Sequence, residues 1–303
     1  NTAIVTKCLK LVREAIKNHA STEYYTEEGH LLLLKGDLAE SEQAFNKAIS
    51  ADESNIAASN GLIKCLILRG KFEEAEQNLH IMLELDDTIE ELYYKAELHY
   101  LTGMLYSRKE NDSTKATQSF DNTIKITEIM IKNTPLSIEY YQKVNPQMML
   151  ELAREYCQYC PAEPLDPTDP PVPIIDKALK AVELVVKLVP GMLEAKILQA
   201  KLKFISRDFE LAQHSVNSCL TMDPSYADSH LLSAQIAYSQ ENYIGASAAL
   251  EQALSHNLAV KEWPSYCLLK ARVCAATGEI QQALQTLEYT MKLVKAKSRQ
   301  NIS

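Results

Sequence analysis

Two matching stretches of the sequence decide the fold: GHLLLLKGDLAESEQAF at residues 29–45 and IKCLILRGKFEEAEQNL at residues 63–79. In each stretch a glycine, Gly36 or Gly70, is followed two positions later by a large apolar residue. Each glycine also precedes a segment rich in good helix formers. The two glycines are separated by the period of one class of stacked helical hairpins, about 34 residues.

Two columns of residues recur along the chain with this pattern. The first column is small, and its members are Ser41, Ala75, Ala116, Ala178, Ala212, Ala246 and Ala283. The second column stands four positions later and is apolar, with Phe45, Leu79, Phe120, Val182, Val216, Leu250 and Leu287. A spacing of four keeps both columns on one face of a helix. Two helices pack closely only where one position is small, so that the neighbouring ridge fills the groove.

The preceding helices supply a matching small position, at Gly29, Ala153, Ala200, Ala234 and Ala271. The second repeat departs from this pattern with Ile63, and the third departs with Glu97. Further repeat positions are Gly278 and a pair of prolines one period apart, Pro190 and Pro224. We therefore predict an all-α fold, a right-handed superhelical solenoid of tetratricopeptide helical hairpins.

The predicted organisation has two blocks of repeats. The first block, 1–133, begins with a single helix at 3–19 and continues with about three hairpins. An irregular link at 134–144 leads to the second block, 145–303, with about four hairpins. The predicted hairpins are 22–55, 56–89, 90–133, 145–190, 193–226, 227–260 and 264–297. No polar face caps either end, so we expect the natural protein to continue in at least one direction.

Two interruptions break the regular repeat. The third repeat carries a surplus of seven residues, which the alignment with the first repeat assigns to the polar turn at 107–113. The second interruption, 161–173, holds six of the 11 prolines. Proline does not continue a helix, so we expect an extended loop that leaves the stack between the two helices of one repeat.

Composition and charge argue against several classes of function. The formal net charge of −9 disfavours nucleic acid as a partner. No apolar run approaches the ~20 residues that a membrane span needs. The seven cysteines are odd in number, and most lie in helical patterns, where we expect reduced thiols that pack as small apolar groups.

Motifs for catalysis or metal binding are missing from the sequence. There is no glycine-rich phosphate loop and no G-x-S-x-G pattern. Cys157 and Cys160 have C-x-x-C spacing, but a structural zinc site needs a second pair of ligands. Carboxylate pairs such as Glu27 and Glu28 are typical of solvated helix faces. We therefore predict that the chain is not an enzyme and has no metal site and no cofactor.

Candidate residues for binding a partner lie outside the repeat columns. In the proline-rich loop they are Pro164, Asp166, Asp169 and Pro171. Tyr24, Tyr94 and Trp263 are candidates because outward-facing tyrosine and tryptophan suit protein interfaces. His30 follows the small Gly29, so it is expected on the concave side of the solenoid.

The irregular segments are more specific than the repeats. They are YYQKVNPQMMLEL at 140–152, EYCQYCP at 155–161 with the proline-rich loop, VPG at 189–191, NSCLTMDPSYADSHLLSAQ at 217–235 and GLIKC at 61–65. Together these segments resemble the tetratricopeptide repeat protein twenty-one family, the long tetratricopeptide subunit of intraflagellar transport complex A. The resemblance covers nearly the whole chain, as an internal to C-terminal segment, and is most specific at 145–190.

This resemblance implies a non-catalytic subunit that supports retrograde ciliary transport, entry of ciliary cargo and cilium assembly. The implied partners are other complex A subunits and adaptors of ciliary membrane-protein cargo. The implied location is the cilium or flagellum and the basal body, with a cytoplasmic pool. We expect the concave groove and the loop at 161–173 to contact the other subunits.

Two alternative functions remain open. A tetratricopeptide co-chaperone binds C-terminal carboxylates and needs Lys, Arg and Asn side chains that converge in the groove. The first helices here contribute glutamates such as Glu23, Glu90 and Glu194 among scattered lysines such as Lys64 and Lys201. The second alternative is a scaffold of another multi-protein assembly, such as a cell-cycle or transcription complex.

Overall fold

A computed structural model describes residues 2–135, 137, 140, 143–166, 168, 170 and 172–300. Within these residues all regular structure is helical, with fifteen α-helices in consecutive packed pairs and no strand. This confirms the predicted all-α hairpin architecture. The chain divides into two compact units, residues 1–148 and 149–303, which are described separately below.

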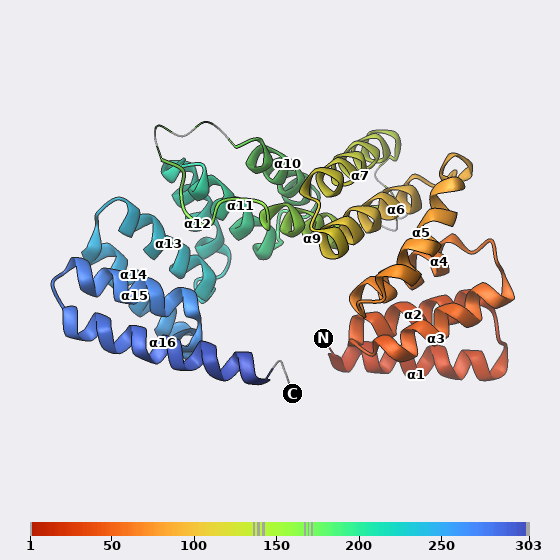
Figure 1. The fold of residues 1–303 in the computed structure, drawn as a ribbon, viewed down its shortest axis with the longest axis horizontal. Helices are drawn as coiled ribbons and strands as arrows, with labels where there is room; N and C mark the ends of the chain where they lie inside the picture. The colour runs from red at the N-terminus through yellow and green to blue at the C-terminus, as the bar shows by residue number, and fades with distance from the viewer. Residues whose placement is uncertain are drawn as a thin grey trace. The chain divides into compact units, whose positions relative to one another are not determined.

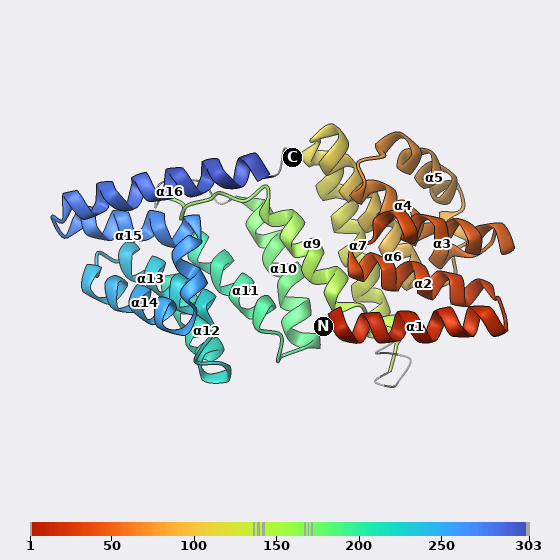
Figure 2. The same ribbon diagram turned by 90° about the horizontal axis from the view of Figure 1, so that it is seen from below.

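The first unit begins with one helix, and hairpins follow it (Figures 1 and 2). Its elements are α1 (Thr2–Asn18), α2 (Thr22–Lys35), α3 (Leu38–Ala51), α4 (Ile56–Leu68), α5 (Phe72–Glu84), a 3-10 turn (Asp86–Thr88), α6 (Leu92–Leu105), a π-helical turn (Tyr106–Glu110) and α7 (Ser113–Asn133). Helix α1 packs against α2, and the hairpins are α2–α3, α4–α5 and α6–α7.

The second unit continues the same pattern (Figure 2). Its elements are α9 (Pro146–Cys157), which begins just before the division of the units, α10 (Pro173–Leu188), α11 (Leu193–Ile205), α12 (Phe209–Met222), α13 (Ala227–Ser239), α14 (Tyr243–His256), a 3-10 turn (Leu258–Glu262), α15 (Pro264–Ala276) and α16 (Ile280–Gln300). Pro173 and Pro264 open α10 and α15, at a position where a missing backbone N–H costs nothing.

The turn inside a hairpin needs one residue with left-handed backbone. Gly36 has φ 90°, and its N–H bonds to the carbonyl of Leu33 at 3.1 Å, which satisfies the end of α2. Gly70 and Gly278 have the same conformation. At two other turns of the second unit, after α11 and after α13, this position is held by Arg207 and Glu241, with φ 63° and 60°. A side chain there costs roughly 1–2 kcal/mol relative to glycine.

The small column lies at the closest approach of the helices. Every member is buried, with at most 5% exposure. In the first hairpin the Ser41 hydroxyl donates to the carbonyl of Gly29 across the helix pair at 2.8 Å. A methyl group on Gly29 would overlap the ring of Phe45, and one on Gly61 in the next hairpin would overlap the same ring. The phenyl group of Phe45 is thus fixed between α2, α3 and α4.

The third repeat has a different register from the predicted one. Its small position is Gly103, where a methyl group would overlap the ring of Phe120, so the assignment of Glu97 is wrong. The separation of Gly103 from Ala116 exceeds that of Gly29 from Ser41 by a single position. The turn therefore holds one extra residue rather than seven, accommodated by the π-helical turn that ends at the left-handed Asn111 (φ 52°).

The second repeat keeps the departure that the sequence indicates. Ile63 stands at the small position and is fully buried. Helices α4 and α5 approach each other less closely than the other hairpins of the first unit do. A branched side chain at this point holds the two backbones apart.

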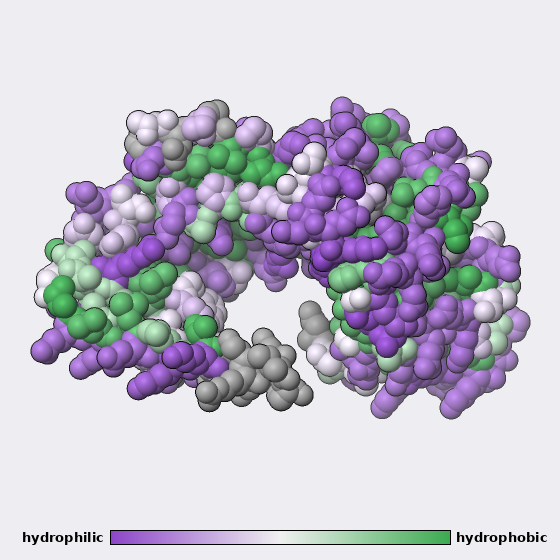
Figure 3. All heavy atoms as spheres, in the orientation of Figure 1, coloured by the Kyte–Doolittle hydropathy of each residue, from purple (hydrophilic) through white to green (hydrophobic). Residues whose placement is uncertain are grey.

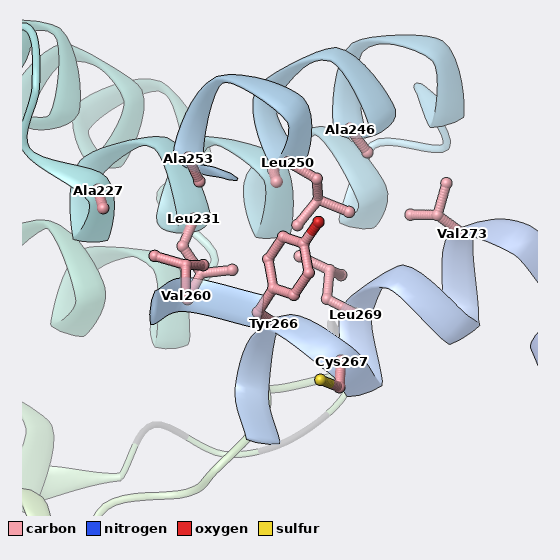
Figure 4. Close-up of a cluster of buried hydrophobic side chains, with 11 residues drawn as sticks. Ala227, Leu231, Ala246, Leu250, Ala253, Val260, Tyr266, Cys267, Leu269 and Val273 are labelled. Atoms are coloured by element: carbon pink, nitrogen blue, oxygen red, sulfur yellow. The ribbon is translucent and has the colours of Figure 1, made fainter. Parts of the chain in front are cut away.

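The apolar cores of the second unit lie between successive hairpins. Figure 4 shows one core, in which Leu250 of α14 faces Tyr266 and Leu269 of α15. The last helix is different, because in the described residues no later helix packs over α16. Leu287, the final member of the apolar column, is 38% exposed there, and Figure 3 shows apolar side chains gathered over α15 and α16.

The corrected register predicts an effect of Gly103→Ala. Alanine favours a helix over glycine by about 1 kcal/mol. Here, however, the new methyl group overlaps Phe120, so we expect a net loss of stability of about 1–2 kcal/mol. Gly191→Ala is the matched control, because nothing lies within 4 Å of its added methyl group. Denaturant unfolding of both variants tests this, and a Gly103→Ala protein as stable as the control would show the register to be wrong.

Candidate functional site

The first helices of the second unit share one open face, built in register with their small residues. Glu194, Asp228 and Ser265 stand six positions before the small residue; Ile197 and Leu231 stand three before; and Arg154, Lys201 and Gln235 stand one after. Offsets of three, four and seven residues fall on the same side of a helix. The face therefore consists of an acidic row, an apolar row and a largely basic row.

This face is hollowed into a groove of about 610 Å³. Its lining residues come from α9, α11, α13 and α15 and the turn before α13: Arg154, Glu194, Ile197, Leu198, Lys201, Tyr226, Asp228, Leu231, Leu232, Gln235 and Ser265. We name this set the inner groove. Charged and polar side chains make up most of its lining, and four aliphatic side chains, Ile197, Leu198, Leu231 and Leu232, supply apolar surface among them.

The charges of the inner groove are only partly neutralised. Arg154 forms an ion pair with Glu194 across α9 and α11 at 2.5 Å. Burial, followed by the nearby charge of Glu194, raises the pKa of Asp228 above its usual value. Burial also raises the pKa of Tyr226 to about 12, with a contribution from Asp228, so its hydroxyl stays neutral at physiological pH.

The equivalent face of the first unit is closed. Thr26, Asn60 and Tyr100 stand three positions before the small residues, and all three are buried. The amide of Asn55 donates to the Thr26 hydroxyl at 3.1 Å, and the amide of Asn60 donates to the Tyr94 carbonyl at 3.1 Å. These bonds join neighbouring first helices directly, so this face is closed at the described positions where the second unit is hollowed.

His30 belongs to this closed face. Its ring stands edge-on to Phe45, with ring centroids 5.1 Å apart and planes at 74°. Burial, with a smaller effect from the charge of Lys64, lowers the pKa of His30 to about 4. The side chain is therefore a neutral packing group at physiological pH.

The three aromatic candidates lie in separate places. Tyr24 is 38% exposed on α2. Tyr94 is half-buried, and its ring stacks on that of Tyr93 with centroids 3.9 Å apart. Trp263 is half-buried and packs on the core around Tyr266. Tyr24 and Tyr94 belong to the first unit, with His30, whereas Trp263 belongs to the second unit, with the loop.

The first part of the proline-rich loop does not leave the stack, contrary to expectation. The N–H of Leu165 donates to the carbonyl of Ile205 at 2.9 Å, and its carbonyl accepts from the Arg207 guanidinium at 3.3 Å. Glu163 pairs with Arg272 of α15 at 2.9 Å. The first part of the loop therefore lies along two hairpins that come later in the sequence. Its backbone bonds to the turn after α11, and the Glu163 side chain pairs with α15.

The loop candidates have different exposures. Pro164 is half-buried and Asp166 is exposed. Asp169 and Pro171 lie outside the described residues.

The contacts of Arg207 account for its unfavourable backbone. Besides bonding to the loop, its guanidinium lies 5.6 Å from the centre of the Phe209 ring. A glycine at this turn would remove the left-handed strain but would lose both contacts.

Cys157 and Cys160 share a hydrogen bond between their thiols, which raises the pKa of Cys157 and lowers that of Cys160. Among the described residues no group of three or more His, Cys, Asp and Glu side chains could hold a metal ion. No helix in the same residues is long and apolar enough to cross a membrane.

Sequence reasoning missed most of the inner groove. It noted Glu194 and Lys201 but not Arg154, Asp228 or Tyr226. The signal was available, because the lining residues stand at fixed offsets from the small residues Ala153, Ala200, Ala234 and Ala271. The sequence does not indicate whether the face is open, since residues at the same offsets form a closed face in the first unit.

Stacked hairpins with one open inner face define a helical-repeat scaffold of the tetratricopeptide type. A solved structure of Pseudomonas aeruginosa PilF supports this fold, with a TM-score of 0.54 over 82% of this chain and 96% of that chain, at 15% sequence identity. The family model described as the tetratricopeptide repeat protein 21 second ARM domain matches residues 1–241. The chain belongs to the tetratricopeptide repeat protein 21 family.

Two relatives illustrate this membership. Tetratricopeptide repeat protein 21B of Homo sapiens is 34% identical over 291 residues, which is 96% of this chain and 22% of that protein. Tetratricopeptide repeat protein 21A of Mus musculus is 31% identical over 276 residues, which is 91% of this chain and 21% of that protein. The chain thus spans about a fifth of the length of these relatives.

Mild acid should destabilise the fold through His30. Between the usual histidine pKa of 6.5 and the folded value of about 4, the unfolded chain binds a proton that the folded chain does not. Stability is therefore lost as the pH falls from 7.5 to 5. We expect His30 to contribute roughly 1–2 kcal/mol of this loss. Denaturant unfolding of wild type and His30→Gln at both pH values tests this, and equal losses in the two proteins would contradict it.

The two non-glycine turns of the second unit, at Arg207 and Glu241, should respond differently to glycine. Glu241→Gly removes left-handed strain at an exposed residue and should stabilise the chain by about 0.5–1 kcal/mol. Arg207→Gly removes the same strain but also the contacts with Leu165 and Phe209. We expect Arg207→Gly to be no more stable than the wild type and its loop to be cleaved faster by a protease. Thermal melting with limited proteolysis distinguishes the variants, and equal behaviour would mean that Arg207 does not fix the loop.

Proposed function

We propose that the chain is a non-catalytic scaffold whose inner groove binds a segment of another protein. The observation that carries the proposal is the groove itself, about 610 Å³ in volume, whose lining combines charges of both signs with four aliphatic side chains. Its walls are first helices held in register by the hairpin cores, so the site is preformed. A rigid site avoids part of the ordering cost of binding.

We propose further that the bound proteins are subunits of intraflagellar transport complex A. Family membership and the resemblance of the irregular segments support this step. On this proposal the protein acts in retrograde ciliary transport, entry of ciliary cargo and cilium assembly. Adaptors of membrane-protein cargo are further proposed partners, and the cilium, the basal body and a cytoplasmic pool are the proposed locations.

The charge pattern disfavours the co-chaperone alternative. A site for C-terminal carboxylates needs several converging cationic or amide side chains. In the inner groove Arg154 is already paired with Glu194, and Asp228 faces the same hollow. A bound carboxylate would meet both acidic side chains, so a clamp of that kind is not supported.

Two matched substitutions test the groove as a partner site. Leu198→Glu places a charge on the groove lining, whereas Ile244→Glu places the same charge on α14 at a residue that is 86% exposed. In affinity capture of the full-length protein from ciliated cells, we expect Leu198→Glu to lose transport subunits at least fivefold and Ile244→Glu to retain them. Melting of the purified variants checks that both remain folded.

Each part of the proposal has its own contrary result. Absence of transport subunits from the wild-type capture would exclude the ciliary assignment. An unchanged capture by Leu198→Glu would exclude the groove. Deletion of 162–172 tests the proposed loop contact in the same assay, and unchanged capture would exclude that contact.

A further inference from the structure

Two opposite charges of the inner groove make no ion pair among the described residues. Lys201 on α11 is exposed, and neither an ion pair nor a hydrogen bond of its ammonium group is present there. Asp228 on α13 likewise makes no ion pair there, and the charge of Lys201 has only a small lowering effect on its pKa, which burial and Glu194 raise. Both side chains line the same hollow, on adjacent and contacting helices.

The neighbouring cations of the basic row are already satisfied. Arg154 is paired with Glu194, and Arg272, which stands at the same offset from its small residue Ala271, is paired with Glu163 of the proline-rich loop. Both arginines of the row thus hold a carboxylate, and between them stand Gln235, which is neutral, and Lys201, a cation that makes no ion pair in the described residues. In the acidic row, Asp228 is the carboxylate that makes no ion pair in the described residues.

The apolar row lies between the two charges. Ile197 and Leu231 occupy the middle row, three positions before the small residues of α11 and α13. The rows of Asp228 and Lys201 are seven positions apart, which is about 10 Å along a helix. With helix axes roughly 8–10 Å apart, the backbones at the two charges lie roughly 14 Å apart on the diagonal.

An extended chain covers this distance in about four residues, at ~3.3 Å per residue, and its alternate side chains point to one side. We infer that the inner groove takes an extended protein segment with the pattern basic-x-apolar-x-acidic, in either chain direction. The basic side chain pairs with Asp228, the acidic side chain pairs with Lys201, and the apolar side chain lies on Ile197 and Leu231. This inference rests on the proposed partner-binding function and specifies the chemistry of the partner.

A double-mutant cycle with defined peptides tests the pattern. The probe is a fluorescein-labelled, acetylated and amidated peptide, Gly-Lys-Ser-Leu-Ser-Glu-Gly, and its neutral versions carry Gln for Lys or Gln for Glu. The whole chain is used as wild type, Lys201→Gln and Asp228→Asn. The control, Lys187→Gln, changes an exposed lysine of α10 outside the groove. Fluorescence anisotropy gives each dissociation constant.

We expect Lys201→Gln to weaken binding of the charged peptide threefold to tenfold and to leave the peptide without Glu unaffected. Asp228→Asn should weaken binding of the charged peptide to the same degree and leave the peptide without Lys unaffected. Lys187→Gln should change none of the dissociation constants. Such pairwise coupling identifies which charges meet.

Four results would overturn the inference: no measurable binding of the charged peptide, equal binding of a fully neutral peptide, tighter binding of a peptide with two Glu residues, or weakening that does not depend on the peptide charge. These outcomes are separate from those of the capture experiment. Loss of transport subunits with Leu198→Glu, together with no charge coupling here, would retain the partner site and remove only the pattern.

Discussion

The fold depends on the close approach of two helices at one small residue in each hairpin. Where the residue is Gly29 or Gly103, an aromatic ring from the second helix fills the space that a methyl group would need. Where it is Ile63, the helices stand further apart. Because each hairpin buries its outer ridge only against the next hairpin, this contact fixes the distance and the rotation of every first helix.

The inner groove follows from that rotation. Once the small residue of a first helix points at its partner, residues six before, three before and one after it share the remaining face. In the second unit these residues are Glu194, Ile197 and Lys201 on α11, and the face is open. In the first unit they include Thr26 and Asn60, whose hydrogen bonds join adjacent helices and close the face. The same scaffold thus carries a binding surface or a polar seam, depending on side-chain length and charge.

The sequence is sufficient for the fold class, because the small and apolar columns are imposed by packing and recur at a fixed period. The sequence is a less reliable guide to the register of a repeat where packing tolerates an inserted residue. The assignment of Glu97 to the small position hides Gly103, since a π-helical turn absorbs one extra residue without a local signal. Most of the groove escapes prediction for another reason: Asp228 and Arg154 look like ordinary surface charges until neighbouring helices show which of them lack partners. The loop is also difficult to predict, because proline indicates the end of a helix but says nothing about what the following backbone binds.

The attachment of the loop also alters how the second unit holds together. In a simple solenoid each hairpin touches only its neighbours, so the array can melt from one end in steps. Here a segment that leaves α9 reaches the turn after α11 and the middle of α15. It adds an exposed ion pair between hairpins that are not adjacent in the stack, so the hairpins that contain α9 and α15 are joined directly as well as through their neighbours. The strained backbone at Arg207 is the local cost of holding the loop in this position.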